Sequence, residues 1–172
     1  MAKLRLVENG VARCPICGED KLLSDFAISN SVKNTVKRAY LCKECNKAKT
    51  HEYRNTETGF WVGLWNNLNG SAKARNLSVE VEKSDILKLW KYQNGLCVLT
   101  GIPMQLVKAK RETRARCLNH YRASVDRIDS NLGYTKDNIR LVCAYVNIMR
   151  SDMTDEQLKF WCSAILKGPN HG

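Results

Sequence analysis

The sequence has no long apolar stretch, and this absence excludes several classes of protein. No run of residues approaches the roughly 18 apolar residues that a transmembrane helix needs. The first residues, MAKLRLVENG, also contain no apolar segment of the kind found in secretory signal peptides. We therefore expect a cytoplasmic protein with no membrane partner. In that compartment its eight cysteines are metal ligands or buried thiols and not disulfides.

Acidic residues are scarce relative to basic ones. The chain has 17 Asp and Glu against 28 Lys and Arg, which gives a net charge of +11. Such an excess favours a polyanionic partner, with double-stranded DNA as the expected one, although a basic protein without such a partner has the same composition. With 172 residues, 44% of them hydrophobic, the chain can form one compact core beside a small zinc-binding module.

Two C-x2-C pairs near the start of the chain have the spacing of zinc ligands. They are Cys14 with Cys17 and Cys42 with Cys45. Four thiolates complete a tetrahedral structural zinc site, and Gly18 allows the sharp turn after the first pair. Basic residues surround the second pair, where they either contact DNA phosphates or form a solvated face: Arg38, Lys43, Lys47, Lys49 and Arg54.

Apolar residues at helical spacing predict three helices. The first covers residues 60–68, and the Asn-rich segment 66–70 predicts a bend or an early stop, with Lys73 and Arg75 beyond it in reach of a phosphate. The second begins after Ser84 as its N-cap and ends at residues 94–95. The third begins with a capping box of Thr154 and Gln157 and ends at Gly168. We expect it to bury one stripe, formed by Leu158, Trp161, Ile165 and Leu166.

The segment 123–150 carries the chemistry. Residues 124–128 and 138–143 are expected to form two strands joined by a turn, and residues 144–150 a short helix packed against them. This arrangement brings Asp126 and Asn147 towards one another. A carboxylate and an amide carbonyl are hard oxygen ligands, suited to Mg2+ that polarises a phosphate.

The same segment, ASVDRIDSNLGYTKDNIRLVCAYVNIMR, resembles the HNH, or ββα-metal, nucleases. It matches their pattern V-D-R-x-D, G-Y, N-x-R-L and N-x-x-K/R, and residues 94–104 resemble phage-type members of that family. The resemblance implies that Asp126 and Asn147 hold the catalytic metal and that Asn138 pins the turn. It also places the hydroxyl of Tyr134 near a phosphate, with ordinary turn packing as the alternative.

One departure from the family affects the mechanism. Most HNH enzymes have Asp-His where this chain has Asp126 and Arg127. A guanidinium cannot accept a proton near neutral pH, so we expect Arg127 to clamp the scissile phosphate. The candidates for the general base are then His120, His51, His171, or a water molecule activated without a side chain.

Four cysteines remain outside the C-x2-C pairs. Cys97, Cys117 and Cys143 with His120 form a possible Cys3His zinc site, in which case His120 is not the base; Cys162 is expected to be a buried thiol. The loop before the first catalytic strand is either a DNA-contacting segment or a solvated one. Its basic residues are Lys108, Lys110, Arg111, Arg114, Arg116 and Arg122.

Together these observations predict an α+β protein in three parts. Residues 1–55 form a zinc-binding module, residues 56–95 linking helices, and residues 96–172 the ββα-metal nuclease core with its C-terminal helix. The expected function is a metal-dependent DNA endonuclease, of the type II restriction kind and homodimeric, with structural Zn2+ and catalytic Mg2+ or Mn2+. The alternatives are a phage or mobile-element nicking enzyme, and a catalytically inactive zinc-dependent DNA-binding protein.

Overall fold

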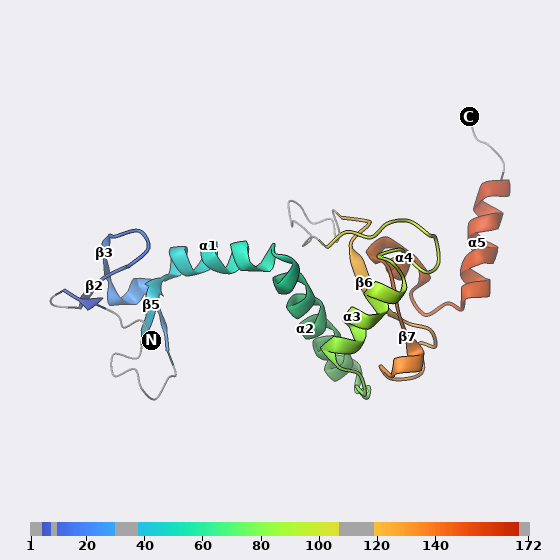
Figure 1. Cartoon of the computed structure of the whole chain (residues 1–172), viewed down its shortest axis with the longest axis horizontal. Helices are drawn as coiled ribbons and strands as arrows, with labels where there is room; N and C mark the ends of the chain where they lie inside the picture. The colour runs from blue at the N-terminus through green and yellow to red at the C-terminus, as the bar shows by residue number, and fades with distance from the viewer. Residues whose placement is uncertain (1–4, 8–9, 30–37, 107–118, 169–172) are drawn as a thin grey trace. The chain divides into compact units, whose positions relative to one another are not determined.

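The computed structural model describes residues 5–7, 10–29, 38–106 and 119–168, and it divides the chain into two compact units, Met1–Tyr53 and Arg54–Gly172 (Figure 1). Both units combine helices with short antiparallel strands, so the predicted α+β class is confirmed. Within the described ranges, no helix is both long and apolar enough to cross a bilayer. Some predicted residues lie outside these ranges: Lys108, Lys110, Arg111, Arg114, Arg116, Cys117 and His171.

The described residues of the first unit form five short strands and one α-helix. Strands β1 (Arg5–Leu6), β2 (Val11–Arg13) and β3 (Asp20–Leu22) form an antiparallel sheet. The 3-10 turn η1 (Leu23–Asp25) leads to β4 (Phe26–Ile28), which pairs with β5 (Arg38–Cys42) before helix α1 (Lys43–Arg54). The buried core of this unit is Ala12, Cys14, Phe26, Leu41 and Cys42. A core this small usually needs a metal or a covalent cross-link to stabilise it.

The second unit begins with helix α2 (Glu57–Arg75), which is longer than the sequence predicted. The helix continues through residues 66–70, so the early stop, one of the two outcomes expected there, does not occur. Asn69 donates a hydrogen bond to the Trp65 carbonyl at 2.9 Å, and the buried residues Leu64, Leu68 and Ala72 continue one apolar stripe past the Asn-rich segment. Tertiary packing has therefore overridden the low helix propensity of Asn and Gly.

Helix α3 (Lys83–Tyr92) has a different cap from the one predicted. Its N-cap is Glu82 and not Ser84, because the Asp85 carboxylate accepts a hydrogen bond from the Glu82 amide at 3.0 Å in a capping box. Ser84 instead donates to the Glu82 carboxylate at 3.2 Å. Asn94, where the sequence predicted a stop, has a left-handed backbone with φ of 52°.

The ββα segment follows its predicted order within about one residue. Strand β6 (Ala123–Arg127) pairs antiparallel with β7 (Ile139–Cys143), so Asp126 lies opposite Arg140. The 3-10 turn η2 (Lys136–Asn138) precedes β7, and helix α4 (Ala144–Arg150) follows it. Helices α2 and α3 share one hydrophobic core with this hairpin, centred on Phe60, Ile86, Ala123, Leu141 and Val142.

The two outer edges of the hairpin are occupied by other parts of the unit. On the β7 side, the Gln93 side chain donates to the Leu141 carbonyl at 2.8 Å and accepts from the Leu141 amide at 2.9 Å. On the β6 side, the Ala123 amide donates to the Gln105 carbonyl at 3.0 Å. The side-chain amide of Gln93 thus takes the place of a neighbouring strand.

Helix α5 (Asp155–Lys167) has the predicted start but not the predicted packing. Thr154 and Gln157 form the expected capping box, with hydrogen bonds of 2.9 and 3.3 Å. The expectation of a buried stripe is wrong, because Trp161, Ile165 and Leu166 are 56%, 74% and 84% exposed. Helical periodicity identified an apolar face but not a partner for it.

Candidate metal centre and anion-binding cleft

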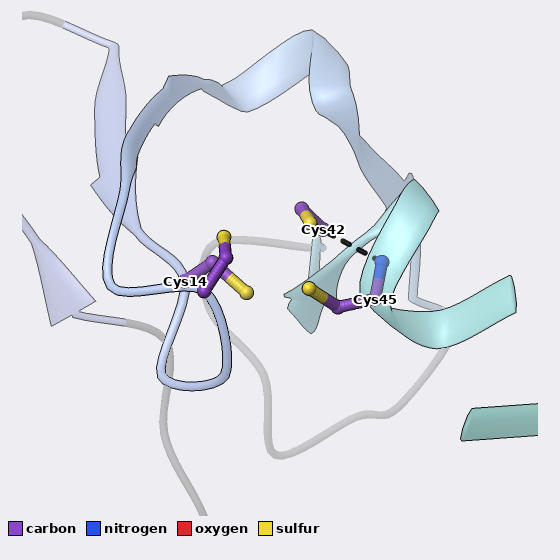
Figure 2. Close-up of side chains that lie close together, drawn as sticks. Cys14, Cys42 and Cys45 are labelled. Atoms are coloured by element: carbon purple, nitrogen blue, oxygen red, sulfur yellow. Dashed lines mark hydrogen bonds between the residues drawn. The ribbon is translucent and has the colours of Figure 1, made fainter. Parts of the chain in front are cut away.

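The four cysteines of the two C-x2-C pairs come together in the first unit. Their sulfur atoms all lie within 4.8 Å of one another. Cys14 and Cys17 belong to the turn after β2, which Gly18 closes with φ of 73° and a 2.9 Å hydrogen bond to the Cys14 carbonyl. Cys42 ends β5, and the Cys45 amide at the start of α1 donates to its sulfur at 3.5 Å (Figure 2).

The geometry and the acidity of these thiols suit a zinc ion. With Zn–S bonds of about 2.3 Å, tetrahedral thiolates lie about 3.8 Å apart, within the observed spread. Burial opposes ionisation of Cys14, but hydrogen bonds from backbone amides, that of Cys42 foremost, outweigh it and lower its pKa to about 6. The neighbouring Cys42 side chain raises the pKa of Cys45 to about 12. A cation is what would allow all four thiols to ionise together.

The expected second zinc site is not assembled in the described part of the chain. Cys97 and Cys143 are buried side by side, where burial and the nearby Cys97 raise the pKa of Cys143 to about 11. His120 packs its ring against Tyr145, with ring centres 4.2 Å apart. Among the described residues, the four-cysteine cluster is the only group of three or more potential ligands close enough to share an ion.

A cleft of about 700 Å³ in the second unit gathers most of the predicted catalytic residues. Asp126 and Asn147, the predicted metal ligands, both line it, as do Arg127 and Tyr134. Arg75 of α2 and Arg122 before β6, both predicted to bind DNA, line it as well. His120 is not one of its lining residues, so the structure does not bring this candidate base to the predicted metal ligands.

Asp126 lies at the centre of a buried ion-pair network. One of its carboxylate oxygens accepts from Arg140 Nε at 2.8 Å and the other from Arg150 Nη1 at 2.9 Å. Both arginines also contact Asp155 at the start of α5, with Arg140 donating two hydrogen bonds of 2.6 Å. These bonds with Arg140, opposed by partial burial, hold the pKa of Asp155 below its usual value.

The oxygen donors of the cleft remain compatible with a hard divalent cation. Each carboxylate oxygen of Asp126 accepts a single hydrogen bond from an arginine, which leaves lone-pair capacity on both. The Asn147 amide nitrogen donates to Ser124 Oγ at 2.9 Å and to the Val125 carbonyl at 3.0 Å. No described residue donates to its carbonyl oxygen, so that atom has the donor chemistry Mg2+ requires.

Asn138 has the supporting position expected of it. Its side-chain oxygen accepts from the Asp129 amide at 2.8 Å, while its nitrogen donates to the carbonyls of Asp129 and Gly133 at 3.0 and 2.8 Å. The amide therefore uses its hydrogen-bonding groups to hold the turn between β6 and β7. Asn138 thus supports the turn beside the cleft and is not one of the residues that line the cleft.

Arginine side chains supply the positive charge of the cleft. Arg122 Nε is buried without a hydrogen-bond partner, the only such side-chain nitrogen or oxygen among the described residues. Arg127 donates to the Leu132 carbonyl at 2.7 Å, and its guanidinium lies 5.4 Å from the centre of the Tyr134 ring. An unsatisfied buried donor is costly, so the Arg122 guanidinium suits an anionic ligand such as a phosphate.

Most of the other predicted DNA-contacting residues that the structure describes are exposed. Lys43 and Lys47 are exposed on α1, and Lys73 is exposed in the last turn of α2. Arg38 is half-buried on β5 and donates to the Phe26 carbonyl at 3.3 Å. Cys162 on α5 is half-buried, where the sequence predicted a buried thiol.

Three charged residues of this region were missed by the sequence analysis. Arg140 and Arg150 occupy the Arg positions of the N-x-R-L and N-x-x-R patterns. The patterns contain these arginines but do not predict that they form ion pairs with Asp126. Asp152 lines the cleft, and its carboxylate has no ion-pair partner among the described residues. It follows Ser151, whose positive φ of 52° is unusual for a residue other than glycine. A single Asp two residues after α4 carried no sequence signal.

The chain thus combines a four-cysteine module with a ββα unit whose cleft holds oxygen ligands and arginines. In comparisons with known proteins, no family model and no curated protein matches it. Its structure is similar to that of PacI, described as a rare-cutting HNH restriction endonuclease with an extraordinary mechanism of DNA perturbation. The identity is 23%, the match covers 90% of this chain and 93% of that chain, and the TM-score is 0.44.

Proposed function

We propose that this protein is a metal-dependent DNA endonuclease that hydrolyses phosphodiester bonds in the cleft of the second unit. The observation that carries the proposal is the pairing of two kinds of group in one cleft. Asp126 and Asn147 offer hard oxygen ligands, and Arg122 offers a buried guanidinium nitrogen without a partner. A phosphodiester satisfies both kinds of group, because its oxygens bind a divalent metal and accept from arginine.

The roles of the side chains follow from their chemistry. Asp126 and Asn147 would hold Mg2+ or Mn2+, which supplies stabilisation of the charge that develops on the phosphate and the leaving oxygen. The Arg122 guanidinium binds and orients the scissile phosphate, and Arg127 is positioned to clamp a second phosphate oxygen once it releases the Leu132 carbonyl. Arg140 and Arg150 orient Asp126 through its two carboxylate oxygens.

Asp152 is our candidate for the group that accepts the proton from the attacking water. His120 lies outside the cleft, and Arg127 cannot accept a proton. Asp152 lines the same cleft as Asp126, and its carboxylate forms no ion pair with an arginine in the described structure. The proton then passes from the water to Asp152, and the departing 3′ oxygen takes a proton from solvent.

The finer assignment is a type II restriction-type enzyme that acts as a homodimer. One chain offers one such cleft, and cutting both strands of a palindromic site requires two clefts related by a twofold axis. We further propose that three parts of the chain have different roles. Residues 1–55 form the zinc-binding module, residues 56–95 supply Arg75 to the cleft, and residues 96–172 carry the metal ligands.

One observation favours a second candidate, a DNA-binding protein without nuclease activity. Both oxygens of Asp126 are engaged by arginines, which reduces the attraction of that carboxylate for a cation. In such a protein the guanidinium groups of the cleft would bind the DNA backbone without any hydrolysis.

Cleavage of plasmid and genomic DNA with Mg2+ or Mn2+ separates the two candidates. We expect wild type to cut, while Asn147→Ala binds DNA but does not cut. Asn66→Ala serves as the matched control, because Asn66 is exposed on α2 and does not line the cleft. If the wild type binds every DNA tested and cuts none, the DNA-binding candidate replaces the nuclease.

Two further variants test the assigned roles within the cleft. Asp152→Asn should lower the rate of cleavage by about 10²- to 10⁴-fold without weakening DNA binding. Arg122→Ala should weaken binding to all sequences and reduce the dependence of log K on log[salt] by about one. An Asp152→Asn enzyme that cuts as fast as wild type would remove Asp152 from the mechanism.

Metal analysis tests the structural site independently of activity. We propose one zinc ion per chain, held by the four cysteines, and we expect Cys42→Ala to lose it. A second equivalent of zinc would restore the proposal of a site at Cys97, Cys117, His120 and Cys143.

A further inference from the structure

Helix α5 leaves an apolar strip without a partner in the described structure. Phe160, Trp161, Ala164 and Ile165 recur at i, i+1, i+4 and i+5, which is the spacing of one helix face. None of the residues of α5 is buried, and Phe160, Trp161 and Ile165 are 63%, 56% and 74% exposed. Of the half-buried residues, Leu158 lies at the edge of this strip, three residues before Trp161 and seven before Ile165, and Cys162 lies beyond that edge.

The charges of α5 argue against two of the surfaces that such a strip could meet. Two acidic residues, Asp155 and Glu156, balance Lys159 and Lys167, so the helix is neutral in a chain of net charge +11. DNA would favour a basic face, and a helix that lies on a membrane normally has a polar face rich in Lys and Arg. A neutral apolar strip suits another protein surface.

We propose that the strip of α5 packs against the same strip of a second copy of this chain, with the two helices antiparallel. A twofold axis between Cys162 and Ser163 would place Phe160 opposite Ile165, and Trp161 opposite Ala164 of the second copy. Large side chains would then face smaller ones, and the helix dipoles would oppose each other favourably. The inference rests on the proposed function in one respect only, namely that cleavage of both DNA strands requires two clefts.

Charge complementarity supports the antiparallel arrangement. Glu156 and Lys167 flank the strip on the same side, in line with Phe160 at i, i+4 and i+11. Under a twofold axis this flank meets its own copy, so Glu156 of one chain approaches Lys167 of the other at each end of the pair. Lys159 lies on the far side of the helix from the strip.

The apolar area that the side chains of the α5 strip expose is in the range that a dimer contact needs. An aromatic side chain buries about 150–250 Å², so Phe160 and Trp161 each expose on the order of 100 Å². From the two copies these aromatics alone supply about a third of the roughly 1,200 Å² of a small specific interface. Ile165, which is 74% exposed, extends the contact.

Sedimentation equilibrium of the full chain without DNA tests the interface. We expect a dimer for wild type and a monomer for Ile165→Asp, which changes an exposed residue and should keep the circular dichroism spectrum of wild type. Tyr92→Asp is the matched control, since Tyr92 is 85% exposed at the end of α3. A wild-type monomer at micromolar concentration, or a dimer that Ile165→Asp leaves intact, overturns the proposal.

Charge reversal tests the register of the pair. Glu156→Lys and Lys167→Glu should each raise the dimer dissociation constant by about fivefold, and the double variant should restore it. Lys159→Glu, the matched reversal on the far side, should change it little; an equal effect of all three reversals would refute the antiparallel register. Because mass is measured and not cleavage, an inactive dimer contradicts only the proposed nuclease, and an active monomer contradicts only this interface.

Discussion

Replacing Arg150 with methionine should destabilise the second unit more than any change to an exposed ion pair. The Arg150 side chain is 2% exposed and donates to Asp126, to Asp155 and to the Ile128 carbonyl. Methionine fills a similar volume but donates nothing, so it leaves one oxygen of Asp126 buried and unpaired. Removing one partner of a buried ion pair costs about 3–5 kcal/mol, and that is the loss we expect in the free energy of unfolding.

Urea unfolding followed by tryptophan fluorescence measures this loss of stability in the second unit. All four tryptophans, Trp61, Trp65, Trp90 and Trp161, belong to the second unit, so their signal reports on that unit and not on the four-cysteine unit. Lys88→Met is the control, because Lys88 is 75% exposed and pairs with Asp85 at 3.3 Å. The reasoning is refuted if Arg150→Met unfolds within about 1 kcal/mol of wild type, or if the control loses as much.

Three further predictions concern the same unit. The pKa of Asp155 is lowered in the folded state by its hydrogen bonds with Arg140, so its contribution is present above the unfolded pKa of about 3.9 and is lost as pH falls through the lower folded value. Asp155→Asn should therefore lower the urea midpoint at pH 7, and the two midpoints should converge in acid; a constant difference across pH would contradict this. Gly133→Ala should destabilise the fold, because its Cβ would overlap Ser78 Oγ and lie 2.7 Å from the Ser78 carbonyl oxygen. Gly63→Ala, whose Cβ meets no atom within 4 Å on helix α2, should instead stabilise it by about 0.5–1 kcal/mol in the same unfolding assay.

The backbone order of the ββα segment could be predicted from sequence because its signals are local. Alternation, a turn and a short helix follow one another within 28 residues, and Asn138 has the hydrogen bonds that its place before β7 suggested. The clustering of the four cysteines was equally predictable from two identical spacings. In both cases the interacting groups are set by short segments or by a ligand geometry common to many proteins.

Long-range pairing of charges was not predictable in the same way. Arg150 reaches Asp126 across 24 residues, and nothing in the local pattern distinguishes a buried arginine from an exposed one. The assignment of His120 as a base used its sequence distance from β6, but its ring turns to Tyr145. For α5, periodicity located an apolar face, but burial depends on what covers that face.

Gln93 has a consequence for how this protein avoids misassembly. A two-stranded hairpin normally leaves unpaired backbone groups along both edges, where a strand of another molecule can add and begin aggregation. Here the Gln93 amide satisfies both backbone groups of Leu141 at the middle of β7. The Val98 amide also donates to the Leu141 carbonyl at 3.3 Å, so the segment after α3 covers this edge as well. The middle of β7 therefore has its outward backbone groups paired within the chain, and a strand of another molecule finds no free donor or acceptor at Leu141.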